Sequence, residues 1–186
     1  MSHVWHYKRM ALRTRLLIVG GVTLYVWALL VWDYFHGGVP VHHFLAREDM
    51  PAFSNWWGGL LLPLLTAFVT YRVQQRVATV NPKAEIPTSV ILTFLSTLVY
   101  GGAIAFCFSQ GVEDVPFYML VALIAFSLFF PIYWGEFFLG LIVGLTYTFG
   151  GVLPVIIVSL LCVIGLFSYK VVRPAVMWCM ALVRGK

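Results

Sequence analysis

The sequence predicts an all-α integral membrane protein, a bundle of about six transmembrane helices that forms a single domain over residues 1–186. Hydrophobic residues make up 61% of the chain and charged residues 10%, and the mean hydropathy is +0.92. Soluble domains are about 45–50% apolar and about 25% charged. The basic residues gather at the ends of apolar segments, as they do in loops beside a membrane. Both observations exclude an ordinary soluble domain.

Turn-forming residues divide the apolar sequence into six expected spans. These spans cover residues 16–35, 55–72, 87–108, 116–133, 135–149 and 152–169. Gly37, Gly38 and Pro40 stop the first span. The fourth starts at Pro116, because proline suits the first turn of a helix, and Pro63 is expected to kink the second.

The apolar stretch 136–169 is too long to be one span. As a single helix it would measure about 51 Å at 1.5 Å per residue, whereas the hydrocarbon core of a bilayer is about 30 Å thick. Gly150 and Gly151 mark the expected break. The fifth span is then short, and it could instead extend back through Pro131 or be re-entrant.

Basic side chains set the expected orientation, because Lys and Arg favour cytoplasmic loops. With six spans and a cytoplasmic N-terminus, only Arg47 of the 12 basic residues lies outside. The others are Lys8, Arg9, Arg13, Arg15, Arg72, Arg76, Lys83, Lys170, Arg173, Arg184 and Lys186. Five spans would place the basic C-terminal tail outside. We therefore expect a multi-pass inner (plasma) membrane protein with both termini cytoplasmic and a retained N-terminal signal anchor.

The first outer loop is expected to contain a short interfacial helix over residues 40–49. Pro40 can start this helix, and Val41, Phe44 and Leu45 recur with the i, i+3, i+4 spacing of an apolar helical face. Such a helix would lie on the outer leaflet or on the mouth of the bundle.

Histidines and a carboxylate beside this loop suggest a metal site. Asp33 and His36 are three residues apart, so a helix places them on one face. On the interfacial helix His42 and His43 would point about 100° apart, and one of them is expected to join His36. Imidazole and carboxylate groups are ligands that zinc and copper accept. The sequence therefore predicts a zinc or copper site that uses Asp33, His36 and His42 or His43.

Further carboxylates lie on the same expected face. Asp49, Glu113 and Asp114 could supply another metal ligand or the general base of a hydrolytic reaction. The spacing matches no standard metalloprotease signature, since H-E-x-x-H is absent from the sequence. The alternative interpretation is that these histidines and acids solvate an outer loop and make it sensitive to pH.

Three functions remain open from the sequence, and they leave open whether the chain is an enzyme. The first is an outer-face site, metal-dependent or metal-handling, that acts on a lipid or a periplasmic substrate. The second is a small channel or transporter with the histidines at its outer mouth. The third is a noncatalytic assembly partner. No basic patch with interleaved aromatics is present, so nucleic acid is not an expected partner.

Small residues and one acid complete the prediction. Gly140 and Gly144 in the fifth span, with Gly101 and Gly102 in the third, permit close helix approach, either within the bundle or between copies in a homo-oligomer. Glu136 lies at the inner boundary of the fifth span. It is either a proton-relay acid or an anion that the dipole of its own helix stabilises.

Overall fold

The computed structural model describes residues 12–43, 52–80, 86–112 and 114–184, and most of them are helical. The elements, in chain order, are α1 (Leu12–Phe35), β1 (Val41–His43), β2 (Ala52–Ser54), a 3-10 turn (Asn55–Trp57), α2 (Gly58–Val80), α3 (Thr88–Ser109), α4 (Asp114–Phe126), α5 (Gly135–Phe149), α6 (Val152–Phe167), a π-helical stretch (Ser168–Val172) and α7 (Arg173–Arg184).

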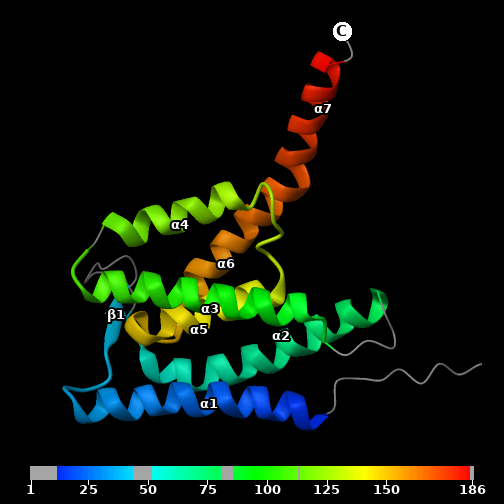
Figure 1. The fold of residues 1–186 in the computed structure, drawn as a ribbon. Helices are drawn as coiled ribbons and strands as arrows, with labels where there is room; N and C mark the ends of the chain where they lie inside the picture. The colour runs from blue at the N-terminus through cyan, green and yellow to red at the C-terminus, as the bar shows by residue number, and fades with distance from the viewer. Residues whose placement is uncertain (1–11, 44–51, 81–85, 113, 185–186) are drawn as a thin grey trace, which may run out of the picture.

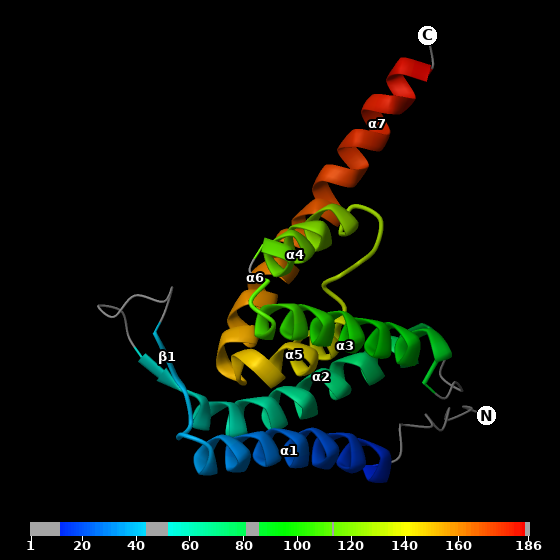
Figure 2. The same cartoon turned by 60° about the vertical axis from the view of Figure 1, so that its left-hand side comes forward.

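Successive helices from α1 to α6 run back and forth (Figure 1). The ends of α1, α3 and α5 therefore lie at the same end of the bundle as the starts of α2, α4 and α6. Figure 2 shows that α7 continues α6 away from the other helices. We call the end with the last turn of α1 and the two strands the hairpin end, and the opposite end the basic end.

Three of the described helices are long and apolar enough to cross a membrane: Arg13–Phe35, Thr88–Ser109 and Val152–Leu182. Helices α4 and α5 are apolar but shorter. Large hydrophobic side chains such as Leu24, Val99 and Phe129 are exposed on the outside of the bundle. In water so much exposed apolar surface would be unfavourable, so the structure is consistent with the predicted helical membrane protein.

Helix α4 stops at Phe126, well before the expected end of the fourth span at 133. The chain continues through turns, and the side chain of Ile132 becomes fully buried. Gly165 of α6 makes room for it, because a Cβ at Gly165 would collide with Ile132. Burial of this side chain against α6 fixes the path of the chain after α4, and Pro131 would interrupt a longer helix because it lacks an amide proton.

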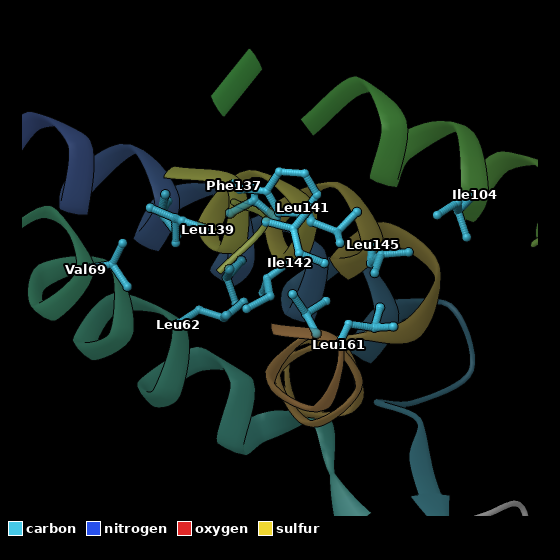
Figure 3. Close-up of a cluster of buried hydrophobic side chains, with 14 of the residues drawn as sticks. Leu62, Val69, Ile104, Phe137, Leu139, Leu141, Ile142, Leu145 and Leu161 are labelled. Carbon is cyan, nitrogen blue, oxygen red and sulfur yellow. The ribbon is translucent and has the colours of Figure 1, made fainter. Parts of the chain in front are cut away.

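Helix α5 forms the centre of the bundle. It packs against α3, α6, α2 and α1, and residues 136–137 and 139–146 are buried. In Figure 3 Ile142 and Leu145 of α5 lie among Leu62 of α2, Leu161 of α6 and other buried apolar side chains. A helix that is apolar on all sides is expected to be buried, either among other helices or in a membrane, and α5 is buried among other helices.

Glycines set the distance between α3 and α5, which are in the most extensive contact of any helix pair described here. A Cβ at Gly101 would lie 2.6 Å from the carbonyl oxygen of Leu141. A Cβ at Gly144 would lie 2.7 Å from the amide nitrogen of Gly102 and would collide with the carbonyl oxygen of Leu98. The close approach expected from the glycines therefore occurs within one chain. Gly102 itself has open space where a Cβ would be.

Buried hydroxyl groups in the helices bond to their own backbone. Thr66, Thr70, Thr97 and Thr146 each donate to the carbonyl oxygen four residues earlier, at 2.7–2.9 Å. This pairing removes the penalty for an unsatisfied polar group in an apolar interior. These threonines therefore need no partner from another helix.

The predicted interfacial helix over 40–49 is wrong at residues 41–43, which form strand β1. This strand pairs antiparallel with β2, with Val41 opposite Ser54 and His43 opposite Ala52. The amide of Asn55 adds a hydrogen bond to the carbonyl oxygen of Pro40 at 3.2 Å. The backbone of residues 40–43 forms its hydrogen bonds with residues 52–55. Helical periodicity within residues 40–49 cannot reveal such a pairing with another segment. Residues 44–49 lie outside the described part of the chain.

The helix spacing gives a direct stability prediction. Gly144→Ala should lower the free energy of unfolding by roughly 1–3 kcal/mol, because its methyl group must push two backbones apart. Gly102→Ala is the matched control on the facing helix α3. Its free energy of unfolding should fall little or not at all, because the added methyl group meets open space. Thermal unfolding of both variants in mild detergent checks this. Equal melting temperatures would contradict the packing.

Candidate functional site

Of the predicted site residues, Asp33, His36 and Asp114 lie at the hairpin end, but the described structure does not gather them into one site. Within residues 12–43, 52–80, 86–112 and 114–184, no three His, Cys, Asp or Glu side chains are placed to share a metal ion. The side chains of His42 and His43 lie outside the described part, as do Asp49 and Glu113. The structure can therefore place only Asp33, His36 and Asp114.

His36 is held by the last turn of α1. Its ring stacks on Trp32, with the ring centroids 3.9 Å apart and an interplanar angle of 14°. Its Nδ1 lies 2.8 Å from the carbonyl oxygen of Trp32. Because a carbonyl oxygen only accepts, Nδ1 must carry the proton, and in the neutral ring Nε2 then keeps its lone pair. An oriented imidazole of this kind is typical of a histidine that can bind a metal.

Asp33 lies in the last turn of α1 and His36 directly follows the helix, yet no hydrogen bond joins their side chains among the described residues. The backbone carbonyl of Asp33 ends the helix, where it accepts from the amides of His36 at 3.1 Å and Gly38 at 3.0 Å. Both Gly37 and Gly38 have a positive φ, at 120° and 96°. Glycine tolerates this conformation, and the chain can turn here into the hairpin.

Asp33 lines a small cavity that the sequence did not predict. The cavity holds about 70 Å³ and lies between the end of α1, the start of α2 and the turn from α5 to α6. Its polar walls are Asp33, Asn55, Thr146, Tyr147 and Thr148, with backbone from Gly150 and Gly151. The volume is enough for one or two water molecules or a small ion.

The cavity walls are rich in hydrogen-bond acceptors. The hydroxyl of Thr146 donates to the carbonyl of Ile142 at 2.7 Å, and the hydroxyl of Thr148 donates to Ala105 at 3.1 Å. Each hydroxyl has one proton, so these oxygens have only lone pairs to offer. With the carboxylate of Asp33, these acceptors suit a cation or a donor group, while the side-chain amide of Asn55 can both donate and accept.

Asn55 connects the hairpin to the turn between α5 and α6. It is buried, with 4% of its surface exposed, and its side-chain amide lies directly against Gly150. Gly150 has φ +69°, and a Cβ there would collide with the amide. Gly58 and Gly151 also touch, since a Cβ at Gly58 would lie 2.9 Å from Cα of Gly151. These contacts hold the ends of three helices together.

Ser54 and Asn55 directly precede α2, and both residue types are common as helix N-caps. Ser54 does cap the 3-10 turn, because its side chain accepts from the amide of Trp56 at 3.4 Å. Asn55 has a different role, as a buried wall of the cavity. The sequence signal for this contact was that Asn55, the pair Gly58 and Gly59, and the pair Gly150 and Gly151 all fall at the outer ends of expected spans.

Asp114 lies apart from this cavity. It is exposed in the first turn of α4, where the helix dipole favours an anion. Among the described residues, no hydrogen bond or ion pair joins it to Asp33 or His36. It shares only the hairpin end of the bundle with them (Figure 1).

At the basic end, Glu136 is bound to Arg76. Nη2 of Arg76 donates to Oε1 of Glu136 at 2.6 Å, and Glu136 is 4% exposed. The guanidinium also lies over the ring of Trp134, 4.2 Å from its centroid. Glu136 is thus part of an ion pair between α2 and α5, which neither sequence interpretation included.

Comparison with known proteins gives no further guidance. No protein-family model matches the chain, and no curated protein or solved structure is significantly similar to it.

The contact between Asn55 and Gly150 can be tested by substitution. Gly150→Ala should lower the free energy of unfolding by more than about 1–2 kcal/mol, since it adds a collision with Asn55 to the strain of a positive φ. Gly111→Ala is the matched control, because Gly111 has φ +76° but open space around it. The double variant Asn55→Ala/Gly150→Ala should lose less unfolding free energy than the sum of the losses in Asn55→Ala and Gly150→Ala. Additive losses in thermal unfolding would show that the contact is absent.

Proposed function

We propose that the chain is an inner-membrane protein of six spans with both termini cytoplasmic and with the hairpin end outside. The alternating direction of α1 to α6 supports an even number of crossings (Figure 1). The predicted cytoplasmic basic residues Arg15, Arg72, Arg76, Lys170 and Arg173 all belong to the basic end, where each except Arg72 lies over an aromatic ring. Basic residues with Trp and Tyr are typical of a cytoplasmic membrane boundary.

The short length of α5 is compatible with this proposal. Its 15 residues reach only about 22 Å at 1.5 Å per residue, less than the bilayer core. Because α2, α3 and α6 surround it, its backbone ends meet protein rather than lipid. Irregular backbone at membrane depth is tolerated where protein buries it.

The function that the hairpin end supports best is metal binding at the outer face. The contact of Nδ1 of His36 with the carbonyl oxygen of Trp32 is the observation that carries this proposal, because it leaves Nε2 of an exposed ring free to act as a ligand. Zinc or copper would be held by His36, by His42 or His43, and by Asp33. The hairpin supports this set, since it returns β1 to the start of α2, beside the cavity that Asp33 lines.

The reaction that we propose is hydrolysis or group transfer on a lipid or periplasmic substrate. A bound metal would supply polarisation of a carbonyl or phosphoryl group and a lower pKa for a bound water. The acceptors in the cavity wall would accept hydrogen bonds from that water or from a substrate hydroxyl. Asp49, Glu113 and Asp114 are the candidates for a general base; of these, Asp114 lies among the described residues, in the first turn of α4.

Metal content decides the proposal. Untagged protein purified in mild detergent should contain about one zinc or copper per chain by elemental analysis. His36→Ala should lose most of it, as should whichever of His42→Ala and His43→Ala removes the second imidazole ligand, because losing one ligand or its orientation typically lowers metal affinity by 10–100-fold or more.

His3→Ala/His6→Ala is the control for this experiment. It removes two imidazoles from the N-terminal segment, which the sequence places on the cytoplasmic side. Its metal content should equal that of the unchanged protein. Absence of stoichiometric metal, or metal retained in both His36→Ala and His43→Ala, would refute the metal site.

A further inference from the structure

A groove at the basic end has the chemistry of a lipid-binding site. It lies between the second half of α2 and the start of α5 and has a volume of about 450 Å³. Pockets that bind small ligands typically measure about 300–1,000 Å³. The groove is independent of the hairpin end, and the inference drawn from it does not rest on the proposed metal site.

One end of the groove is positively charged. Arg72 and Arg76 line it one helical turn apart on α2, with Tyr133 and Trp134 opposite. Glu136 balances Arg76, whereas Arg72 is exposed and belongs to no ion pair among the described residues. Lys170 adds a third positive charge nearby, with Nζ 5.8 Å from the centroid of the Tyr133 ring. The net charge around the groove is therefore positive.

Arg76 is held in place by its neighbours. Its contacts with Glu136 and Trp134 fix the guanidinium from two sides. The start of α5 is pressed onto α2, since a Cβ at Gly135 would lie 2.9 Å from Cγ1 of Val69. A fixed guanidinium binds a phosphate with little loss of side-chain entropy. One donor goes to Oε1 of Glu136, and a guanidinium has five.

The rest of the groove is apolar and opens onto the outer surface of the bundle. Its wall is formed by Leu65, Phe68, Val69, Val73 and Phe138. Phe68 is 60% exposed, so this wall continues onto the outer surface of the bundle. A free phosphate would contact only the arginines, whereas an amphiphile would contact both the arginines and the apolar wall. The inner leaflet of a cell membrane is rich in anionic lipid.

We propose that this groove binds an anionic phospholipid, with the phosphate on Arg72 and Arg76 and one acyl chain along the wall that runs from Leu65 to Phe138. The bound lipid fills the space between α2 and α5. It thereby attaches the basic end to the inner leaflet.

Native mass spectrometry of the full chain tests the proposal. The protein is released from mild detergent after addition of equal amounts of dioleoylphosphatidylglycerol and dioleoylphosphatidylcholine. The unchanged protein should retain phosphatidylglycerol in at least about fivefold excess over phosphatidylcholine. Arg72→Gln should reduce this preference about fivefold, as expected for the loss of one arginine beside an anionic headgroup. Arg72 is exposed, so this variant should fold normally.

Two further variants separate the groove from general surface charge. Arg173→Gln removes a basic residue that lies over Tyr169 and outside the groove, and it should keep the preference. The double variant Arg76→Gln/Glu136→Gln replaces the buried ion pair with a neutral pair and should lose the preference. Equal retention of the two lipids by the unchanged protein would overturn the proposal, as would equal losses in Arg72→Gln and Arg173→Gln.

Free phosphate is the remaining alternative source of the same chemistry. Millimolar sodium phosphate should leave the melting temperature of the detergent-solubilised protein unchanged, while phosphatidylglycerol should raise it. An equal rise with inorganic phosphate alone would overturn the assignment to a lipid.

Discussion

The close approach of α3 and α5 is the contact on which the rest of the molecule depends. Gly101 and Gly144 let the two backbones touch, so a short apolar helix can occupy the centre of the bundle. Both ends of α5 are then fixed. Its last turn carries Gly150 to Asn55 beside the hairpin, and its first turn carries Glu136 to Arg76. The polar cavity and the basic groove are therefore positioned by one central helix.

Much of the fold could be predicted from the sequence because membrane helices are encoded by apolar length and by breakers. The helix Gly135–Phe149 covers the expected fifth span, and Gly150 and Gly151 do separate it from α6. The end of α4 could not be predicted, because Ile132 leaves the helix to bury itself against Gly165, a residue far along the chain. Only three described helices meet simple criteria of length and hydropathy.

The candidate site was less predictable than the fold. Local spacing placed Asp33 and His36 on one face of a helix, but α1 ends at Phe35, and local spacing could not show that His36 turns back to Trp32. Residues 41–43 carry a helical pattern and form a strand, since their hydrogen bonds come from residues beyond the loop. Asn55 and Arg76 meet Gly150 and Glu136 only through the packing of α2 and α5. Contacts between distant segments leave no periodic signal in either one.

The proposed topology places the two ends of the bundle on opposite sides of the membrane, with the hairpin end outside. Labelling of single cysteines in intact cells by an impermeant maleimide tests it most directly, with the other native cysteines replaced by serine. Ser109→Cys at the hairpin end should react in intact cells. Thr79→Cys at the basic end, and native Cys179 kept alone in α7, should react only after the membrane is opened; all three positions are exposed on the protein. Reaction of Cys179 in intact cells, or protection of Ser109→Cys, would contradict the account.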